Sequence, residues 1–314
     1  MKKTLELLGA WALTTLASAV LFTLGTLLFP PVAGVTFTAA EQAESARGML
    51  LMSALDAALV LALVRSSRLS GFRLMLLTAA AYYFVKTLTS QLEAIYFMPN
   101  VTGPMLPALL AMTLPVTLGL PPLAVWLGGR LRPSPLDQQP GLAPLPMGPV
   151  EAWLKLGVLS ALVYPVLFFA AGWFIAFRSE ALAAFYGGAR GETLWSHYAY
   201  VFSHDPFVLV LEMARGGLWV GCAYLLLQST RGPWWVGTLQ VALWFGLLQN
   251  DVHLLPNPLM TAEIRLHHFL ETGSSNFVFG WCIGWLLSRG QRGLVARADQ
   301  VVIERMGAQR PAKT

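Results

Sequence analysis

Charged residues and cysteines are both scarce in this 314-residue chain. Asp, Glu, Lys and Arg together make up 12% of the residues, about half of their share in an ordinary soluble domain. The chain holds two cysteines, Cys222 and Cys282, and both fall inside apolar runs. These absences exclude a soluble globule, a disulfide framework, and a cysteine-based zinc site or redox motif.

Apolar residues take the place of the missing charge, at 56% of the sequence. Eight apolar runs are long enough, alone or with their flanks, to cross a hydrocarbon core, which needs about 20 helical residues. They cover residues 7–29, 46–64, 74–97, 105–128, 154–177, 207–228, 234–255 and 264–288. The net charge of +5 is spread over the segments between these runs. This pattern predicts contact with membrane lipids and argues against nucleic-acid binding.

The Lys and Arg residues predict the orientation of these spans. Cytoplasmic loops of membrane proteins carry the excess of basic residues, and fifteen of the 21 basic residues fall on one side of an eight-span arrangement. They are Lys2, Lys3, Arg65, Arg68, Arg73, Arg130, Arg132, Lys155, Arg231, Arg289, Arg292, Arg297, Arg305, Arg310 and Lys313. We therefore expect an all-α, multi-pass inner-membrane protein with eight transmembrane helices and both termini in the cytoplasm.

Two short patterns recur in the same order, which predicts an internal repeat. Residues 44–48, Glu-Ser-Ala-Arg-Gly, correspond to residues 212–216, Glu-Met-Ala-Arg-Gly, and residues 91–93 correspond to residues 249–251. Repeats in the same orientation imply two parallel four-helix halves. The predicted organisation is a first half at 1–128, a proline-rich cytoplasmic linker at 129–152, a second half at 153–288 and a basic cytoplasmic tail at 289–314.

Two oppositely charged residues, Asp56 and Lys86, lie inside the second and third apolar runs. An ionised side chain at the bilayer centre costs about 2.5–3.5 kcal/mol on insertion scales. Because consecutive spans are antiparallel, the distances of both residues from the ends of their runs place them near the midplane. We expect them to pair, either as a clip between two helices or as part of a proton or ion relay.

A second polar group is predicted towards the outer surface, where the topology places all five histidines. On the eighth run His267 and Glu271 are four residues apart and therefore share one helical face. The predicted outward-facing site comprises Glu212, Arg215, Gln249, Asp251, His253, His267, His268, Glu271 and Ser275, with first-half counterparts Glu44, Arg47, Gln91 and Glu93. Arg215 is expected to pair with Glu212 or Asp251. An aromatic-rich segment, 178–206, is expected to cover the site as a lid.

Three functions remain open on this evidence. The favoured hypothesis is binding or translocation of a small polar, amphipathic or lipid-like ligand, since repeats and a midplane ion pair are typical of transporters. Imidazole and carboxylate groups also suit zinc or another divalent metal. A metal on His253, His268 and Glu271 would make the protein a metal-dependent hydrolase or transferase. The third hypothesis is a non-catalytic assembly subunit or pH sensor.

One stretch resembles the CAAX-protease and bacteriocin-processing family of intramembrane enzymes. That family pairs two glutamates with a following Arg-Gly, then has Phe-x-x-x-His and, on a later helix, His-x-x-x-Asn. Here a single glutamate, Glu212, precedes Arg-Gly, and Gln249 stands where Phe-x-x-x-His needs its histidine. The His-x-x-x-Asn pattern, from His253 to Asn257, begins four residues after Gln249 instead of lying on a later helix. Because the catalytic positions differ, the resemblance implies no shared activity.

Overall fold

The computed structural model describes residues 2–31, 38–98, 101, 103, 105–133, 148–187, 193–257 and 259–288. Over these residues the secondary structure is helical, with two isolated bridges and no strand. Five helices are long and apolar enough to cross a membrane: Lys2–Leu28, Ala39–Ser66, Met105–Leu127, Pro149–Arg178 and Phe207–Ser229. The predicted α-helical, multi-pass membrane protein is thereby confirmed.

The first half of the chain contains four helical segments. They are α1 (Lys2–Leu28), α2 (Ala39–Ser66), the continuous helix of α3 (Gly71–Tyr83), η1 (Phe84–Leu88) and α4 (Thr89–Phe97), and the pair α5 (Met105–Ala111) and α6 (Leu114–Leu127). The segment η1 is π-helical, a wider turn that shifts the register of the side chains beyond it. Helix α1 packs against α2 and α6, and α6 also packs against α2 and α3.

The second half has a similar series of helices. A continuous helix comprises α7 (Pro149–Val158), π-helical η3 (Leu159–Val163) and α8 (Tyr164–Phe174), followed by η4 (Ala176–Arg178), α9 (Glu180–Phe185) and α10 (Leu194–His204). Then come α11 (Phe207–Ser229), α12 (Trp234–Leu243), π-helical η5 (Trp244–Leu248), 3-10 helical η6 (Asp251–Leu254) and α13 (Ala262–Leu287). Helices α8 and α13 are in contact, and α13 also packs against α11 and α12.

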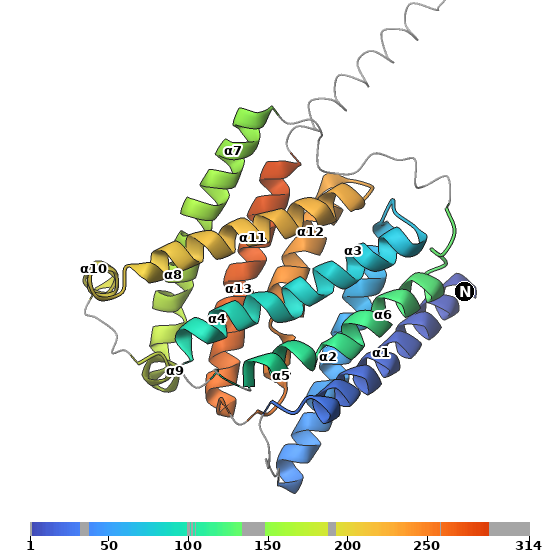
Figure 1. Ribbon diagram of the computed structural model, residues 1–314, viewed down its shortest axis with the longest axis horizontal. Helices are drawn as coiled ribbons and strands as arrows, with labels where there is room; N and C mark the ends of the chain where they lie inside the picture. The colour runs from blue at the N-terminus through green and yellow to red at the C-terminus, as the bar shows by residue number, and fades with distance from the viewer. Residues whose placement is uncertain are drawn as a thin grey trace, which may run out of the picture.

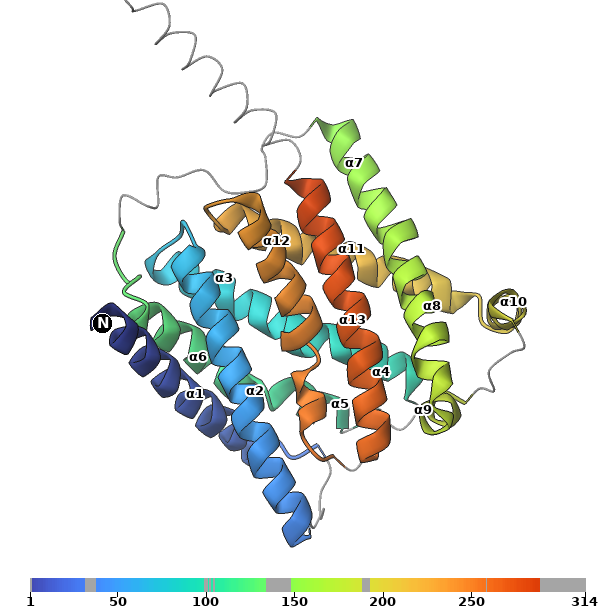
Figure 2. The same ribbon diagram turned by 180° about the vertical axis from the view of Figure 1, so that it is seen from behind.

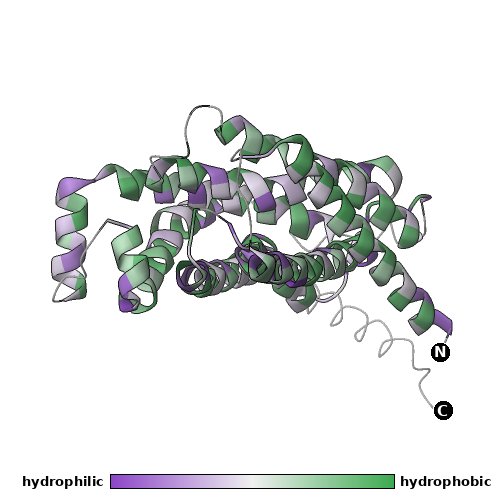
Figure 3. Ribbon diagram, turned by 90° about the horizontal axis from the view of Figure 1, so that it is seen from below, coloured by the Kyte–Doolittle hydropathy of each residue, from purple (hydrophilic) through white to green (hydrophobic). Residues whose placement is uncertain are grey.

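The helices form two crossed layers. Helices α11, α3–α4 and α5–α6 lie on the face seen in Figure 1, and α2, α12, α13 and α7–α8 lie on the face seen in Figure 2. Hydrophobic residues predominate along the helices of both layers (Figure 3). Large apolar side chains such as Leu16, Val20 and Leu27 of α1 are exposed, as expected for helices that face lipid.

The repeated glycines mark close contacts between segments. A Cβ atom at Gly48 would lie 2.2 Å from the carbonyl oxygen of Leu254 in η6, and one at Gly216 would lie 2.9 Å from that of Ser160 in η3. Both glycines therefore let another segment approach α2 or α11 more closely than a side chain would allow.

Two further glycine pairs behave differently from each other. A Cβ at Gly284 of α13 would lie 2.7 Å from Cα of Thr238 in α12, which confirms the close helix approach that the spacing of Gly280 and Gly284 predicts. On α11, the same spacing of Gly217 and Gly221 is misleading. A Cβ at Gly221 would meet no atom within 4 Å, and one at Gly217 would lie 3.9 Å from the Ser160 Cβ, an ordinary contact, so this spacing does not mark a close approach.

The connections near the predicted cytoplasmic side also pair. The turns after α2 and α11 form an isolated antiparallel bridge between Ser67 and Thr230. The backbone N–H of Arg68 donates to Ser229 at 2.7 Å, and that of Arg231 donates to Ser66 at 2.9 Å. These bonds join the turn after α2 to the turn after α11.

The end of the predicted linker is helical. Helix α7 begins at Pro149, three residues before the predicted linker ends, because proline is well suited to the first turn of a helix. The linker residues 134–147 and the predicted basic tail 289–314 lie outside the described residues.

Candidate functional site

A buried ion triad joins the two halves. Lys86 Nζ of η1 lies 3.0 Å from Asp56 Oδ1 of α2 and also donates a hydrogen bond to Asp251 of η6. The Lys86 and both aspartate side chains are at most 1% exposed. The Tyr82 hydroxyl donates to the second Asp56 oxygen at 2.7 Å. The pairing of Asp56 with Lys86 matches the prediction from sequence, whereas Asp251 is predicted among the outer polar residues and lies in the triad instead.

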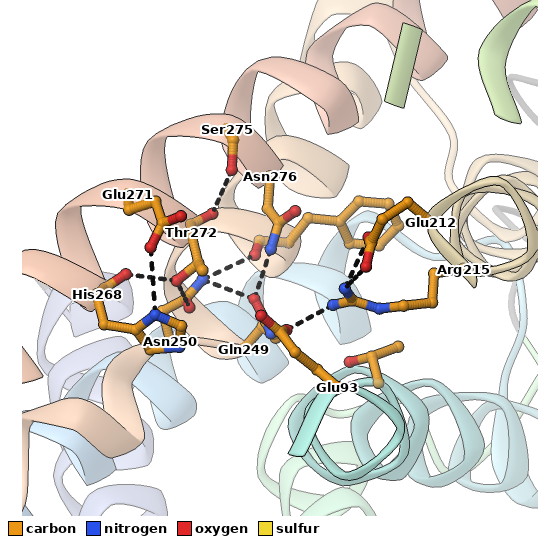
Figure 4. A network of polar contacts seen from close by, with 12 residues as sticks. Glu93, Glu212, Arg215, Gln249, Asn250, His268, Glu271, Thr272, Ser275 and Asn276 are labelled. Atoms are coloured by element: carbon orange, nitrogen blue, oxygen red, sulfur yellow. Dashed lines mark hydrogen bonds and ion pairs between the residues drawn. The ribbon is translucent and has the colours of Figure 1, made fainter. Parts of the chain in front are cut away.

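Arg215 is the centre of a second ionic cluster, with Glu212 and Glu93 (Figure 4). Its guanidinium donates to both carboxylate oxygens of Glu212, at 2.8 and 2.7 Å, and to Glu93 of α4 at 2.5 Å. The planar, forked guanidinium suits such a double partnership. The alternative pairing of Arg215 with Asp251 is wrong, because the turn at η6 directs Asp251 to Lys86 instead.

An amide network surrounds Gln249 (Figure 4). The Gln249 side-chain oxygen accepts hydrogen bonds from Asn250 at 2.7 Å and from Asn276 of α13 at 2.6 Å. The Thr272 hydroxyl donates to Asn250 at 2.5 Å, and that of Ser275 donates to the Thr272 carbonyl at 3.2 Å. The bonds of Asn276 with Gln249 and of Thr272 with Asn250 hold the end of η5 against α13, so Gln249 acts in helix packing, whereas the Ser275 bond lies within α13.

The histidines of α13 face different surroundings. His268 is buried, and its Nδ1 lies 2.6 Å from the Tyr186 hydroxyl and 3.3 Å from Glu271 Oε2. His267 is half-buried, and its Nδ1 lies 2.9 Å from the carbonyl oxygen of Glu263. The His253 ring packs edge-on against the His268 ring with centroids 4.7 Å apart. The predicted continuous polar face is therefore divided, because adjacent residues point about 100° apart on a helix.

The predicted metal site does not form. Among the described residues, no group of three or more His, Cys, Asp or Glu side chains is arranged to hold a metal ion. His253 and His268 contact each other through their rings, while Glu271 Oε2 accepts a hydrogen bond from Tyr186 at 2.7 Å. The proposed ligand set of His253, His268 and Glu271 is therefore wrong.

A cavity of about 530 Å³ lies beside these clusters, and we call it the outer pocket. It is lined by Glu93, Tyr96, Phe97, Phe168, Phe169, Gly172, Phe177, Tyr186, His197, Tyr198, Val201, Asp205, Val208 and Glu271. Half of these residues are Phe or Tyr, three are acidic, and none is Lys or Arg. The predicted site residues Gln249, Asp251, His253, His267 and Ser275 do not line it.

Both halves of the chain build the outer pocket. Glu93, Tyr96 and Phe97 come from α4 in the first half, whereas the other lining residues come from the second half. The predicted polar site lies mainly in the second half, between its last three spans, whereas the outer pocket also takes residues from α4. Of the predicted first-half counterparts, Glu93 joins the pocket. Glu44 pairs instead with Arg265 at 2.5 Å, and neither Arg47 nor Gln91 lines the pocket.

Hydrogen bonds from three tyrosines hold the outer segments in place beside the pocket. Tyr96 donates a hydrogen bond to Asp205, Tyr198 donates to the carbonyl oxygen of Phe169, and Tyr186 donates to Glu271. Burial raises the pKa of both Tyr186 and Tyr198, and the negative charge of Glu271 raises each pKa further. These two hydroxyls therefore remain protonated donors at neutral pH.

The sequence analysis missed several pocket residues, although a signal for them exists. The aromatic pair 96–97 stands at the outer end of a predicted span, where an aromatic belt is also expected, and the pair 168–169 lies within the predicted span 154–177. Because aromatic residues are common in membrane helices for this reason, the sequence does not show that these residues line a cavity. Asp205 follows directly after the predicted lid histidine His204.

The comparisons with known proteins add no relative. No protein-family model, curated protein or solved structure matches the chain.

Proposed function

We propose that this membrane protein binds a small amphipathic ligand in the outer pocket and translocates it across the membrane. The pocket itself carries the proposal. Its volume of about 530 Å³ falls within the range of about 300–1,000 Å³ that is usual for small-molecule sites. Aromatic walls with a few polar groups are also the usual lining of such sites.

We also propose the finer topology of eight spans in two parallel halves with cytoplasmic termini. The helical stretches 71–97 and 262–287 are also long enough to span a membrane. They differ from the five apolar helices in carrying polar residues of the ionic clusters and of the α13 network. The shorter apolar helix Trp234–Leu248 would extend through η6 as the seventh span. The distribution of Lys and Arg supports the orientation.

The packing within each half supports the repeat. In both halves the first span contacts the second and the fourth, and the fourth also contacts the second and the third. The turns that follow α2 and α11 pair with each other, as a twofold relation between the halves would require.

Translocation is supported by where the ionic contacts lie. Lys86–Asp251, Arg215–Glu93 and Arg265–Glu44 all connect one half with the other. Alternating access in repeat transporters is a movement of one repeat against the other around a fixed site. Such a movement would break and re-form these contacts, so that they would set the relative stability of the two states.

A blocking substitution tests the proposal. Gly172 lines the outer pocket, and a Cβ atom there would lie 3.3 Å from the Tyr198 hydroxyl. Gly172→Trp should fill the cavity, whereas Gly157→Trp places the same side chain on the same helical stretch in open space. Purified proteins would be titrated with fluorescent amphipathic dyes of positive, neutral and negative charge, and uptake of the same dyes would be measured in proteoliposomes.

We expect at least one dye to bind saturably and to enter proteoliposomes made with wild-type protein or with Gly157→Trp. Gly172→Trp should abolish both signals while the protein remains folded by circular dichroism. Equal binding by the two tryptophan variants would show that the outer pocket is not the site. Saturable binding without uptake would restrict the function to ligand binding.

A further inference from the structure

The outer pocket has the electrostatic character of a cation site. Glu93, Asp205 and Glu271 line it, and no Lys or Arg is among the lining residues that the structure describes. Arg215 is not a lining residue; it pairs with Glu93 and Glu212, and its guanidinium lies 6.0 Å from the centroid of the Phe168 ring. One cation thus faces two glutamates. Among the described residues, neither Asp205 nor Glu271 forms an ion pair with a Lys or Arg, and the partner of Glu271 is His268, whose Nδ1 lies 3.3 Å from Oε2.

Glu271 is well placed to meet a ligand. Its Oε2 atom accepts the Tyr186 hydrogen bond and lies near His268. Its other oxygen, Oε1, lies 3.8 Å from the position that a Cβ atom would take at Gly172, a residue of the pocket wall. Within the described residues, that oxygen faces the cavity side while its partner is held by Tyr186.

The aromatic wall adds a second, independent preference for positive charge. Phe168, Phe169 and Tyr198 form a connected set of rings, with centroids 5.2 Å apart for Phe168 and Phe169 and 4.9 Å apart for Phe169 and Tyr198. An organic cation is attracted to the face of such rings, most strongly where water is excluded. Inorganic cations need close oxygen ligands instead, and most of this wall offers carbon.

We propose that the ligand of the outer pocket is a lipophilic organic cation, in which an ammonium or phosphonium centre is attached to an apolar body. The centre would lie near Glu271, and the apolar body would lie against the aromatic wall. This inference rests on the proposed function, because it specifies the ligand class of the same pocket.

The test compares two probes of similar shape and opposite charge, tetraphenylphosphonium and tetraphenylborate. Equilibrium binding to the full-length protein in lipid nanodiscs is measured, and the signal of Gly172→Trp is subtracted as partition into lipid. Glu271→Gln removes the charge but keeps an acceptor for Tyr186. Glu180→Gln is its control, because Glu180 is an exposed glutamate of the outer segment that does not line the pocket.

We expect the wild-type protein to bind tetraphenylphosphonium at least about tenfold more tightly than tetraphenylborate, which corresponds to about 1.4 kcal/mol. Glu271→Gln should weaken phosphonium binding about tenfold, and Glu180→Gln should change it less than about twofold, because a solvated charge outside the pocket is screened. Phe169→Leu, which keeps an apolar side chain without the ring, should weaken it about threefold.

Equal or tighter binding of tetraphenylborate in the pocket would overturn the cation assignment and leave the proposed ligand-binding function intact. Wild-type affinity in Glu271→Gln would also overturn it. If neither probe nor any neutral dye binds above the Gly172→Trp signal, the proposed function fails as well. Empty nanodiscs of the same lipid give a second measure of partition into lipid for both probes, so the comparison on wild-type protein stays valid even if a variant does not fold.

Discussion

Lys86→Met removes the charge of Lys86 and keeps the length of its side chain nearly unchanged. It should destabilise the protein more than the same kind of substitution at any other single Lys or Arg. Lys86 lies between Asp56 and Asp251, and both carboxylates are completely buried. At an effective dielectric constant of about 20, unit charges 3.0 Å apart attract each other by about 5–6 kcal/mol. Burial desolvates all three groups and offsets part of this attraction. The expected net loss is therefore about 3–5 kcal/mol, the usual cost of breaking a buried ion pair.

The control is Lys155→Met, since Lys155 pairs with Glu151 one helical turn away and that glutamate is 54% exposed. Such an exposed pair contributes less than about 1 kcal/mol. The assay is the free energy of unfolding, obtained by denaturant titration in mixed micelles. Adding Asp251→Asn to Lys86→Met should recover part of the loss, because it removes one of the two uncompensated charges. If Lys86→Met is no less stable than Lys155→Met, the triad is not held by charge and the reasoning is refuted.

The remaining predictions concern helix contacts and the other polar clusters, and the same titration measures each of them. Gly284→Ala should cost about 1–3 kcal/mol, because its Cβ would lie 2.6 Å from the Thr238 hydroxyl. Gly221→Ala, in open space, should be neutral or stabilising by up to about 1 kcal/mol. Equal effects of the two substitutions on the free energy of unfolding would contradict the packing described. Gln249→Leu should cost about 1–3 kcal/mol, because the buried Asn276 amide loses its acceptor while Asn250 keeps its bond to the Gly246 carbonyl; a loss below about 0.5 kcal/mol would mean that the network is unimportant. Arg215→Lys keeps the charge but cannot reproduce the bidentate contact, so it should cost about 1.5–3 kcal/mol. Arg215→Met should cost more, because it also removes the charge. A smaller loss for Arg215→Met than for Arg215→Lys would argue against a role for charge.

The sequence alone predicts the kind of protein and part of its ionic structure. Apolar run lengths indicate the membrane helices because helical rise and bilayer thickness are both fixed. The contact between Asp56 and Lys86 follows from the positions of both residues in consecutive antiparallel spans. These predictions succeed because they depend on the local length and order of the segments.

The rest depends on features that act over longer distances or change the local register. The π-helical turns at η1 and η5 shift the side chains beyond them, so that a regular helical wheel misplaces the residues that follow. The 3-10 turn at η6 brings Asp251 to Lys86, 165 residues away in sequence. Glu93 and Arg215 are 122 residues apart, and no periodicity in one sequence relates two such positions.

The histidines show how a compositional signal can mislead. Their concentration in the second half suggested a metal site, yet His267 and His253 are absent from the pocket lining and His268 supports Tyr186 and Glu271. The pocket is defined by aromatic residues from α4, α8 and α10 instead. Aromatic residues are common throughout such chains, so that their number alone does not reveal which of them meet.

Site-specific labelling of the outer pocket tests the central claim most directly. Val201 lines the pocket, so Val201→Cys, in a protein whose Cys222 and Cys282 are replaced by alanine, offers one thiol to a membrane-impermeant maleimide. We predict that the thiol reacts in sealed right-side-out vesicles and that tetraphenylphosphonium slows the reaction. A thiol that reacts only in inside-out vesicles, or at a rate that no probe of any charge changes, would contradict an outward-facing ligand pocket.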